Sequence, residues 1–233
     1  MNKINYIQAI KRPFTDFKKF LIGIVLLLVP ILNILTGFIV RGYQLTCSTE
    51  VKKKKYKLPE WTDYKNLFVI GVFSFLISLI YLLPALIILT VSLGSIVLNL
   101  IKTTEFDIEA IITSLTGAEV TGVFVAVILF ALTSYIIPIA LLEYLNKYKF
   151  KQAFKINIVL KKAFKWKYFK VVLLIIVYYI IIYAVFSLVM MLFGLIPYPF
   201  ISQVISVILS SIISFIIGVT AFTLIGEVYP ELK

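Results

Sequence analysis

The sequence predicts an all-α integral membrane protein, and three observations lead to this fold class. The chain of 233 residues is 61% hydrophobic, its mean hydropathy is +1.05, and basic residues flank its long apolar runs. An apolar run of about 18 residues or more can satisfy its backbone polar groups in lipid only as a helix. These runs use nearly the whole chain, so we expect a single membrane domain over residues 1–233 and no separate soluble domain.

We expect about six hydrophobic helices, arranged as three hairpins. The first hairpin would be short, because residues 21–47 are too few for two full spans, which need about 40 residues. Pro30 and Asn33 interrupt this run where a chain reversal costs least. A re-entrant hairpin and a single crossing are the alternatives. The approximate helix ranges are 14–32, 33–50, 67–101, 120–146, 170–193 and 200–226.

Residues 67–101 pose the opposite problem, because they are longer than one span requires. Pro84 divides this run, and no turn residues flank it. We therefore expect one long helix kinked at Pro84, with two separate spans as the alternative. Beyond the run, the spacing of Thr104 and Asp107 resembles a capping box and predicts a short outer helix through Leu115.

The basic residues predict the orientation of the chain in the membrane. Lys and Arg number six in residues 48–66 and nine in 146–170, but only one in 102–119. Because cytoplasmic loops carry the basic excess, 48–66 and 146–170 should be cytoplasmic. With the hairpin at 21–47, the N- and C-termini are cytoplasmic too, and the acidic loop 102–119 lies outside. The net charge of +12 is explained by this topology and by anionic lipid, so we expect no nucleic-acid binding.

One pattern occurs at the start of two hydrophobic helices. Residues 14–23 and 61–71 both read aromatic-Thr-Asp-aromatic-Lys, followed by apolar residues and a glycine. A degenerate third copy lies at 164–170. The Thr or the Asp of each copy is then expected to cap the first free amides of its helix, and the carboxylates of Asp16 and Asp63 to complement the helix dipole.

Two amphipathic stretches, 2–12 and 149–165, are expected to form interfacial helices on the cytoplasmic side. Within 146–170, lysines alternate with aromatic residues that can enter the headgroup boundary. We therefore predict contact with membrane lipids, anionic ones above all. The candidate lipid-facing residues are Lys151, Lys155, Lys161, Lys162, Lys165, Trp166 and Lys167.

A further set of residues and short motifs occurs in a fixed order along residues 3–226. The set consists of Pro30, Asn33, Gly42-Tyr43, Leu58-Pro59-Glu60-Trp61, Asp63-Tyr64, Gly71, Pro138, Ala140-Leu141, Tyr144 and Phe150-Lys151. In this order they resemble the prokaryotic membrane-protein family catalogued as domain of unknown function 4013. The resemblance implies a multi-pass bundle in the cell membrane, commonly of archaea, and brings no known activity.

Residue types that catalysis usually needs are missing. The chain has no His and one Cys, Cys47, so zinc, haem and Cys-His or Ser-His chemistry lack ligands or a base. A glycine-rich phosphate loop is also missing. We therefore expect neither enzymatic activity nor a cofactor or metal.

The ionisable residues near the apolar runs favour structural roles. Arg41 and Glu143 lie toward the cytoplasmic ends of their runs, where an ion pair or a side chain that reaches the interface is tolerated. Together with Pro30, Asn33, Pro59, Glu60, Trp61, Asp63 and Pro138 they form the candidate structural motif. In the last run, small residues at four-residue spacing predict a packing stripe, with a polar pore lining as the alternative. The stripe contains Ser206, Ser210, Ser214 and Gly218.

These expectations favour a non-enzymatic multi-pass membrane protein that organises lipids or a partner through a basic cytoplasmic face. The alternative is a small transporter or channel that acts as an oligomer. A mid-membrane cavity lined by Asn33, Asn99, Gln203 and the serines would favour transport. The sequence leaves the choice between a homo-oligomer and another membrane-protein partner open.

Overall fold

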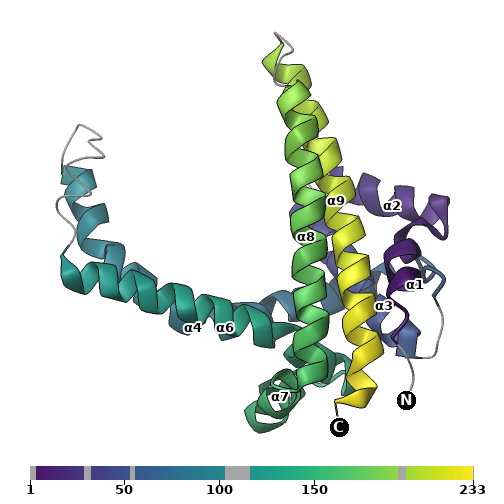
Figure 1. The fold of residues 1–233 in the computed structure, drawn as a ribbon, viewed down its shortest axis with the longest axis horizontal. Helices are drawn as coiled ribbons and strands as arrows, with labels where there is room; N and C mark the ends of the chain where they lie inside the picture. The colour runs from purple at the N-terminus through teal and green to yellow at the C-terminus, as the bar shows by residue number, and fades with distance from the viewer. Residues whose placement is uncertain (1–3, 29–32, 53–55, 103–115, 194–197, 233) are drawn as a thin grey trace. The chain divides into compact units, whose positions relative to one another are not determined.

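The computed structural model describes residues 4–28, 33–52, 56–102, 116–193 and 198–232, and within these ranges every regular element is helical (Figure 1). The all-α class is thereby confirmed for the described part of the chain. The elements are α1 (Tyr6–Lys11), η1 (Arg12–Phe14), α2 (Phe17–Leu28), α3 (Asn33–Lys52), α4 (Tyr64–Lys102), α6 (Gly117–Lys147), η2 (Phe150–Phe154), α7 (Ile156–Ala163), α8 (Trp166–Phe193), α9 (Pro199–Val228) and η3 (Tyr229–Glu231).

Four of these helices are long and apolar enough to cross a membrane. The candidate spans are Tyr64–Gly94, Gly117–Lys147, Trp166–Phe193 and Phe200–Glu231. Helix α2 has 12 residues, which makes it about 18 Å long, whereas the hydrocarbon core of a bilayer is about 30 Å thick. Helix α3 is long enough but carries Arg41, Gln44 and Glu50. The structure therefore supports a multi-pass membrane protein with four candidate spans.

The long third run forms one helix in the structure. Helix α4 passes through Pro84 and begins at Tyr64, three residues before the expected start. Helix α2 begins at Phe17 instead of near Phe14, because Pro13 lies in the 3-10 turn η1 that precedes it. Pro30 and the helix expected over 104–115 lie outside the described residues.

The chain divides into two compact units. Unit 2 is Leu76–Ile137, and unit 1 comprises Met1–Phe75 and Pro138–Lys233. In unit 2, α4 and α6 line a small apolar cavity of about 120 Å³. The single membrane domain expected from the sequence stays a prediction.

The core of unit 1 is formed by α2, α3 and α9 together with the loop before α4. Aromatic rings dominate it: Tyr43 and Phe215 are completely buried, and Phe20 packs edge-on against Phe215 at 5.7 Å. Burial of several aromatic side chains is the largest single source of packing energy in such a core. The buried cluster contains Phe20, Ile24, Val40, Tyr43, Cys47, Leu58, Trp61, Leu67, Phe215 and Val219.

Two glycines bring α3 and the first turns of α4 into backbone contact. A Cβ atom added to Gly42 would lie 1.9 Å from the carbonyl oxygen of Leu67, and one added to Gly71 would lie 1.9 Å from that of Phe38. Only a residue without a side chain fits at either position, as at close helix crossings in membranes generally. Gly71, the glycine of the pattern in residues 61–71, therefore allows this close approach of the two helices.

The two copies of the repeated pattern begin their helices in the same way. An Oδ1 atom of Asp16 accepts the backbone N–H of Lys19 at 3.1 Å, and Oδ1 of Asp63 accepts that of Asn66 at the same distance. Each aspartate thus satisfies a free amide of the first turn. The copies differ in backbone geometry, because Asp63 has a positive φ of 53°.

Candidate functional site

Four segments that are far apart in the sequence meet at one end of unit 1. The backbone N–H of Asn5 donates to Oε1 of Glu227 at 2.9 Å, and the Tyr56 hydroxyl donates to the same oxygen. Lys167 of α8 pairs with Glu231 at 2.7 Å. The N-terminal segment, the loop before α4, the start of α8 and the C-terminal segment therefore lie together.

Arg12 joins three of these segments from a position with no exposed surface. Its Nη1 donates to the Cys47 carbonyl at 2.8 Å and to the Thr223 hydroxyl at 3.0 Å, and its Nη2 donates to the Lys57 carbonyl at 3.3 Å. A buried guanidinium needs such acceptors to offset its lost hydration. In the sequence Arg12 falls on the polar side of the amphipathic stretch 2–12, so its burial was not predicted, and the neighbouring Pro13 is a local signal of a special position.

The Leu-Pro-Glu-Trp string, residues 58–61, fastens the loop onto α2 and α3. Trp61 stacks on Tyr43 with ring centroids 3.7 Å apart, and its Nε1–H donates to the Lys19 carbonyl at 2.9 Å. The carbonyl of Pro59 accepts the Tyr43 hydroxyl at 2.8 Å, and Glu60 pairs with Lys19 at 2.6 Å. The string is therefore a structural clamp: Trp61 is buried in it, and Glu60 pairs with Lys19 at the surface.

Two ionisable groups of the clamp region have shifted pKa values. The backbone N–H of Lys19 is the main cause that lowers the pKa of Asp16 below its usual value of 3.8. Burial, followed by the hydrogen bond to Glu227, raises the pKa of Tyr56 to about 12. Both shifts follow from local contacts, because bonds to the carboxylate favour its charged form and desolvation disfavours phenolate.

Glu143 and Arg41 have different partners. Glu143 pairs with Lys162 at 2.6 Å, and their side chains are only 9% and 18% exposed. The ammonium of Lys162 also lies 4.2 Å from the centroid of the Tyr229 ring. The guanidinium of Arg41 lies 4.7 Å from the centroid of the Phe222 ring. Glu143 therefore connects α6 to α7, and Pro138 lies one and a half turns before it within α6.

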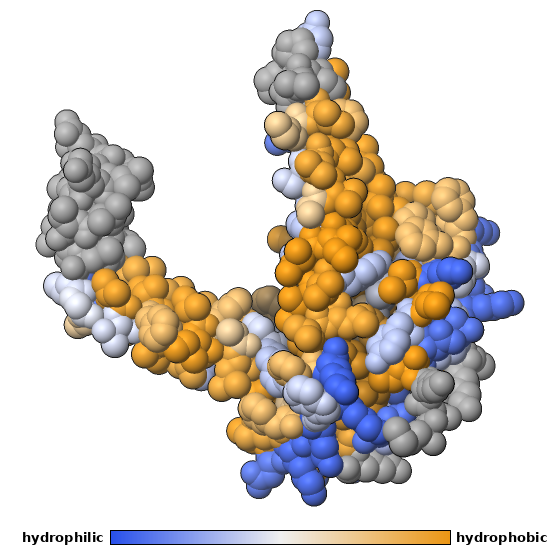
Figure 2. Space-filling model, viewed as in Figure 1, coloured by the Kyte–Doolittle hydropathy of each residue, from blue (hydrophilic) through white to orange (hydrophobic). Residues whose placement is uncertain are grey.

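A different surface, which we call the basic–aromatic face, is formed by η2, α7 and the start of α8. Figure 2 shows hydrophilic side chains gathered at this end of unit 1, next to the hydrophobic surface of α8. The Phe164 and Trp166 side chains are 63% and 66% exposed. Trp166 stacks on Phe169 at 5.2 Å. The face consists of Lys151, Lys155, Lys161, Phe164, Trp166 and Phe169, all of them exposed.

The clamp, residues 58–61, is one part of the set of residues that resembles the family. The sequence profile of the family described as Protein of unknown function (DUF4013) matches residues 22–197. The chain belongs to this family. Neither the curated proteins nor the solved structures give a significant match. In this DUF4013 protein the matched range begins within α2 and ends two residues before α9, and so includes both the clamp and the basic–aromatic face.

The amphipathic stretch 149–165 is not one continuous helix. It consists of the 3-10 helix η2 and the eight-residue α7, with Lys155 between them. Because a 3-10 helix has three residues per turn, this break changes which side chains share a face. Ala153 and Ala163 are buried as expected, whereas Ile156, expected on the same side, is exposed.

Three other candidate lysines of this segment either form ion pairs or are half-buried. Lys162 and Lys167 form the ion pairs described above, and Lys165 is half-buried. Among the described residues, Lys151, Lys155 and Lys161 take part in none of the ion pairs. These three are the exposed candidate lysines without a described ion pair, and Lys147, Lys149 and Lys170 of the same segment are exposed as well.

The small-residue stripe of α9 lies only partly against the rest of unit 1. Gly218 faces the side chain of Gln44, whose Nε2 donates to the Ser214 carbonyl at 3.2 Å. Ser206 is half-buried, but the side chains of Ser210 and Ser214 are exposed. The face of α9 that is buried within this chain contains Ser211 and Phe215, each of which follows a serine of the stripe by one residue. Close packing along Ser206 and Ser210 stays a prediction.

Within the described ranges, no three His, Cys, Asp or Glu side chains are placed to hold a metal ion. Cys47 is buried and has no disulfide partner. The expectation that the protein is not an enzyme stays a prediction.

Proposed function

We propose that this protein is a non-enzymatic, multi-pass protein of the cell membrane that organises anionic lipids through its basic–aromatic face. The observation that carries the proposal is the exposure of Phe164, Trp166 and Phe169 beside three lysines that have no described carboxylate partner. Aromatic side chains of this kind enter the headgroup boundary, and lysines next to them attract anionic headgroups.

The energetics support binding that is selective but reversible. Each basic residue near an anionic surface contributes about 1 kcal/mol, so Lys151, Lys155 and Lys161 together provide a moderate preference. Lys162 and Lys167 add less, because Glu143 and Glu231 already neutralise them. The preference should weaken in high salt, which screens charges at the membrane surface.

The proposal includes an arrangement in the membrane. The helices form three hairpins, of which α2–α3 is re-entrant and the other two supply the four spans. Support comes from the length of α2 and from the contacts that bring both terminal segments to one end of unit 1. Because four crossings are an even number, both termini lie on the same side of the membrane. The excess of basic residues at this end of unit 1 favours the cytoplasmic side for both termini.

Fluorescence of Trp166 tests the proposal. In vesicles, brominated anionic lipid should quench Trp166 more strongly than brominated zwitterionic lipid at the same fraction, with the signal assigned by comparison with a Trp166→Phe variant. Changing Lys151, Lys155 and Lys161 to Gln should remove the difference, and changing them to Arg should keep it.

Equal quenching by both lipids in the unmodified protein would reject lipid selectivity. Solute flux through vesicles that hold the Gln variant or the unmodified protein would favour the transporter alternative instead.

A further inference from the structure

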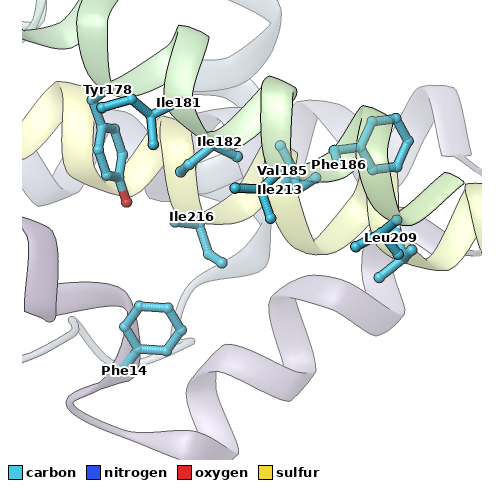
Figure 3. A pocket seen from close by; sticks show the side chains of 10 residues that line it. Phe14, Tyr178, Ile181, Ile182, Val185, Phe186, Leu209, Ile213 and Ile216 are labelled. Carbon is cyan, nitrogen blue, oxygen red and sulfur yellow. The ribbon is translucent and has the colours of Figure 1, made fainter. Parts of the chain in front are cut away.

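Helix α8 has one side that faces α9 and a wide surface that does not. Tyr178, Ile182 and Val185 line an apolar groove of about 280 Å³ between α8 and α9, and their side chains lie along it (Figure 3). Elsewhere the helix has little cover within unit 1, because Tyr168 and Val171 are its buried residues. The groove therefore defines the α9 side of α8, and the remaining surface can bind a partner.

Hydroxyl groups gather on one part of that remaining surface. Tyr179, Tyr183 and Ser187 follow one another at four-residue spacing, so they lie on one face of the helix. All three are exposed, the two tyrosines by 45% and 39%. This hydroxyl face is about 100° round the helix from Tyr178. Beyond Lys170, every hydroxyl group of α8 except that of Tyr178 lies on it.

The two phenols of the hydroxyl face lie within the hydrocarbon core of the membrane. Tyr179 and Tyr183 are 13 and 17 residues beyond Trp166, which is about 20 and 26 Å along a helix. In the proposed arrangement Trp166 lies at the cytoplasmic headgroup boundary, and the core beyond it is about 30 Å thick. Side chains on a helix lean toward its N-terminus, so both hydroxyl groups lie nearer the middle of the core. Water is not available there to accept their hydrogen bonds.

These hydroxyl groups cannot fully satisfy one another. The rings of Tyr179 and Tyr183 stack with their centroids 4.3 Å apart, which brings the two hydroxyl groups close together. One phenol can donate to the other, but the hydrogen of the second then has no acceptor. Ser187 donates to no carbonyl or side chain among the described residues. Because an unpaired hydroxyl in hydrocarbon is costly, this face needs a polar partner.

We propose that the hydroxyl face of α8 binds the same face of a second copy of the chain, in a parallel dimer. All copies have the same orientation in the membrane, so residues at the same depth meet across a two-fold axis. A face that meets itself needs groups that both donate and accept hydrogen bonds, and hydroxyl groups do both. Charged groups would repel their own copies, and residues 171–193 contain none. Hydrogen bonds between helices stabilise such association in membranes.

Cysteine cross-linking in native membranes tests this contact. Ile176 continues the hydroxyl face by one turn, whereas Val177 lies about 100° further round the helix; both side chains are 48% exposed. In a Cys47→Ala background, oxidation by copper phenanthroline should cross-link Ile176→Cys into dimers about fivefold more than Val177→Cys. Equal cross-linking at the two positions would indicate random collision and overturn the proposal. A product of Ile176→Cys with a different protein in place of the dimer would overturn it as well.

A second set of variants tests the hydroxyl groups themselves. In the Ile176→Cys background, combining Tyr179→Phe, Tyr183→Phe and Ser187→Ala keeps the rings of the face and should lower the dimer fraction about fivefold. Tyr178→Phe removes a hydroxyl group on the α9 side and should leave the fraction nearly unchanged. Equal thermal unfolding in detergent checks that both variants are folded. Unchanged cross-linking in the triple variant would refute the role of the hydroxyl groups. The depth of this face rests on the proposed function, but cross-linking does not depend on lipid charge, so dimer formation and lipid selectivity at Trp166 can fail separately.

Discussion

The clamp and the basic–aromatic face are alike in composition and opposite in use. Both combine aromatic residues with lysines next to a hydrophobic helix, yet Trp61 is 8% exposed and Trp166 is 66% exposed. In the clamp Glu60 pairs with Lys19, and beside it Asp16 and Asp63 cap the helices α2 and α4. Residues 146–170 contain nine lysines and no acidic residue. The clamp region therefore supplies carboxylates from its own sequence, whereas the lysines of 146–170 pair only with carboxylates from other segments, as Lys162 does with Glu143.

The largest expected effect contrasts the two tryptophans. Trp61→Ala should lower the free energy of unfolding by about 3–5 kcal/mol, because it removes a buried ring and leaves a cavity beside Tyr43. Trp166→Ala should change it by no more than about 0.5 kcal/mol. Thermal unfolding of both variants in the same detergent measures the difference. Similar losses would show that Trp166 is also part of the core.

A second contrast concerns the two ion pairs of the lysine-rich segment. Glu143→Gln leaves Lys162 poorly exposed and without its counter-charge, which should cost about 2–5 kcal/mol. Glu231→Gln breaks the pair with Lys167, whose side chain is 45% exposed, and should cost at most about 1 kcal/mol. Chemical denaturation in mixed micelles compares the two. A larger loss in Glu231→Gln would contradict the assigned burial.

The smallest effects should come from the two helix caps. Asp63→Ala removes a cap, worth about 1 kcal/mol, and also places alanine at a positive φ. Asp63→Asn keeps both the acceptor and the tolerance of this backbone conformation, so it should recover most of the loss. Thermal unfolding of the two variants checks this order, and an equal loss in both would argue against the cap.

The pH dependence of stability tests whether the Asp16 carboxylate stabilises the start of α2. Its pKa is lowered in the folded protein, so its contribution is present above the unfolded value of about 3.8–3.9 and is lost as the pH falls through the lower, folded pKa. Asp16→Asn should therefore reduce the loss of stability between pH 5 and about pH 3 relative to the unmodified protein. Parallel pH profiles would mean that this carboxylate makes no such contribution.

Sequence patterns predicted the helices well and their contacts poorly. The apolar runs became helices because a helix satisfies its backbone polar groups within the segment, and the Thr-Asp pattern caps both helices through its aspartates. The pairing of Glu143 with Lys162 depends on how α7 packs against α6, which no local pattern encodes. The burial of Arg12 depends on carbonyls from two other segments. The outward side of Ile156 depends on a break at Lys155 that periodicity alone does not reveal.

Lysine footprinting in lipid nanodiscs tests the central contrast most directly. An amine-reactive label, read by mass spectrometry, compares Lys19 with Lys161 in anionic and in zwitterionic nanodiscs. Lys19 is held by Asp16 and Glu60, so it should be protected in both. We predict that Lys161 is protected in anionic nanodiscs and reactive in zwitterionic ones, with the protection reversed by high salt. Equal reactivity of Lys161 in the two lipids would contradict the account.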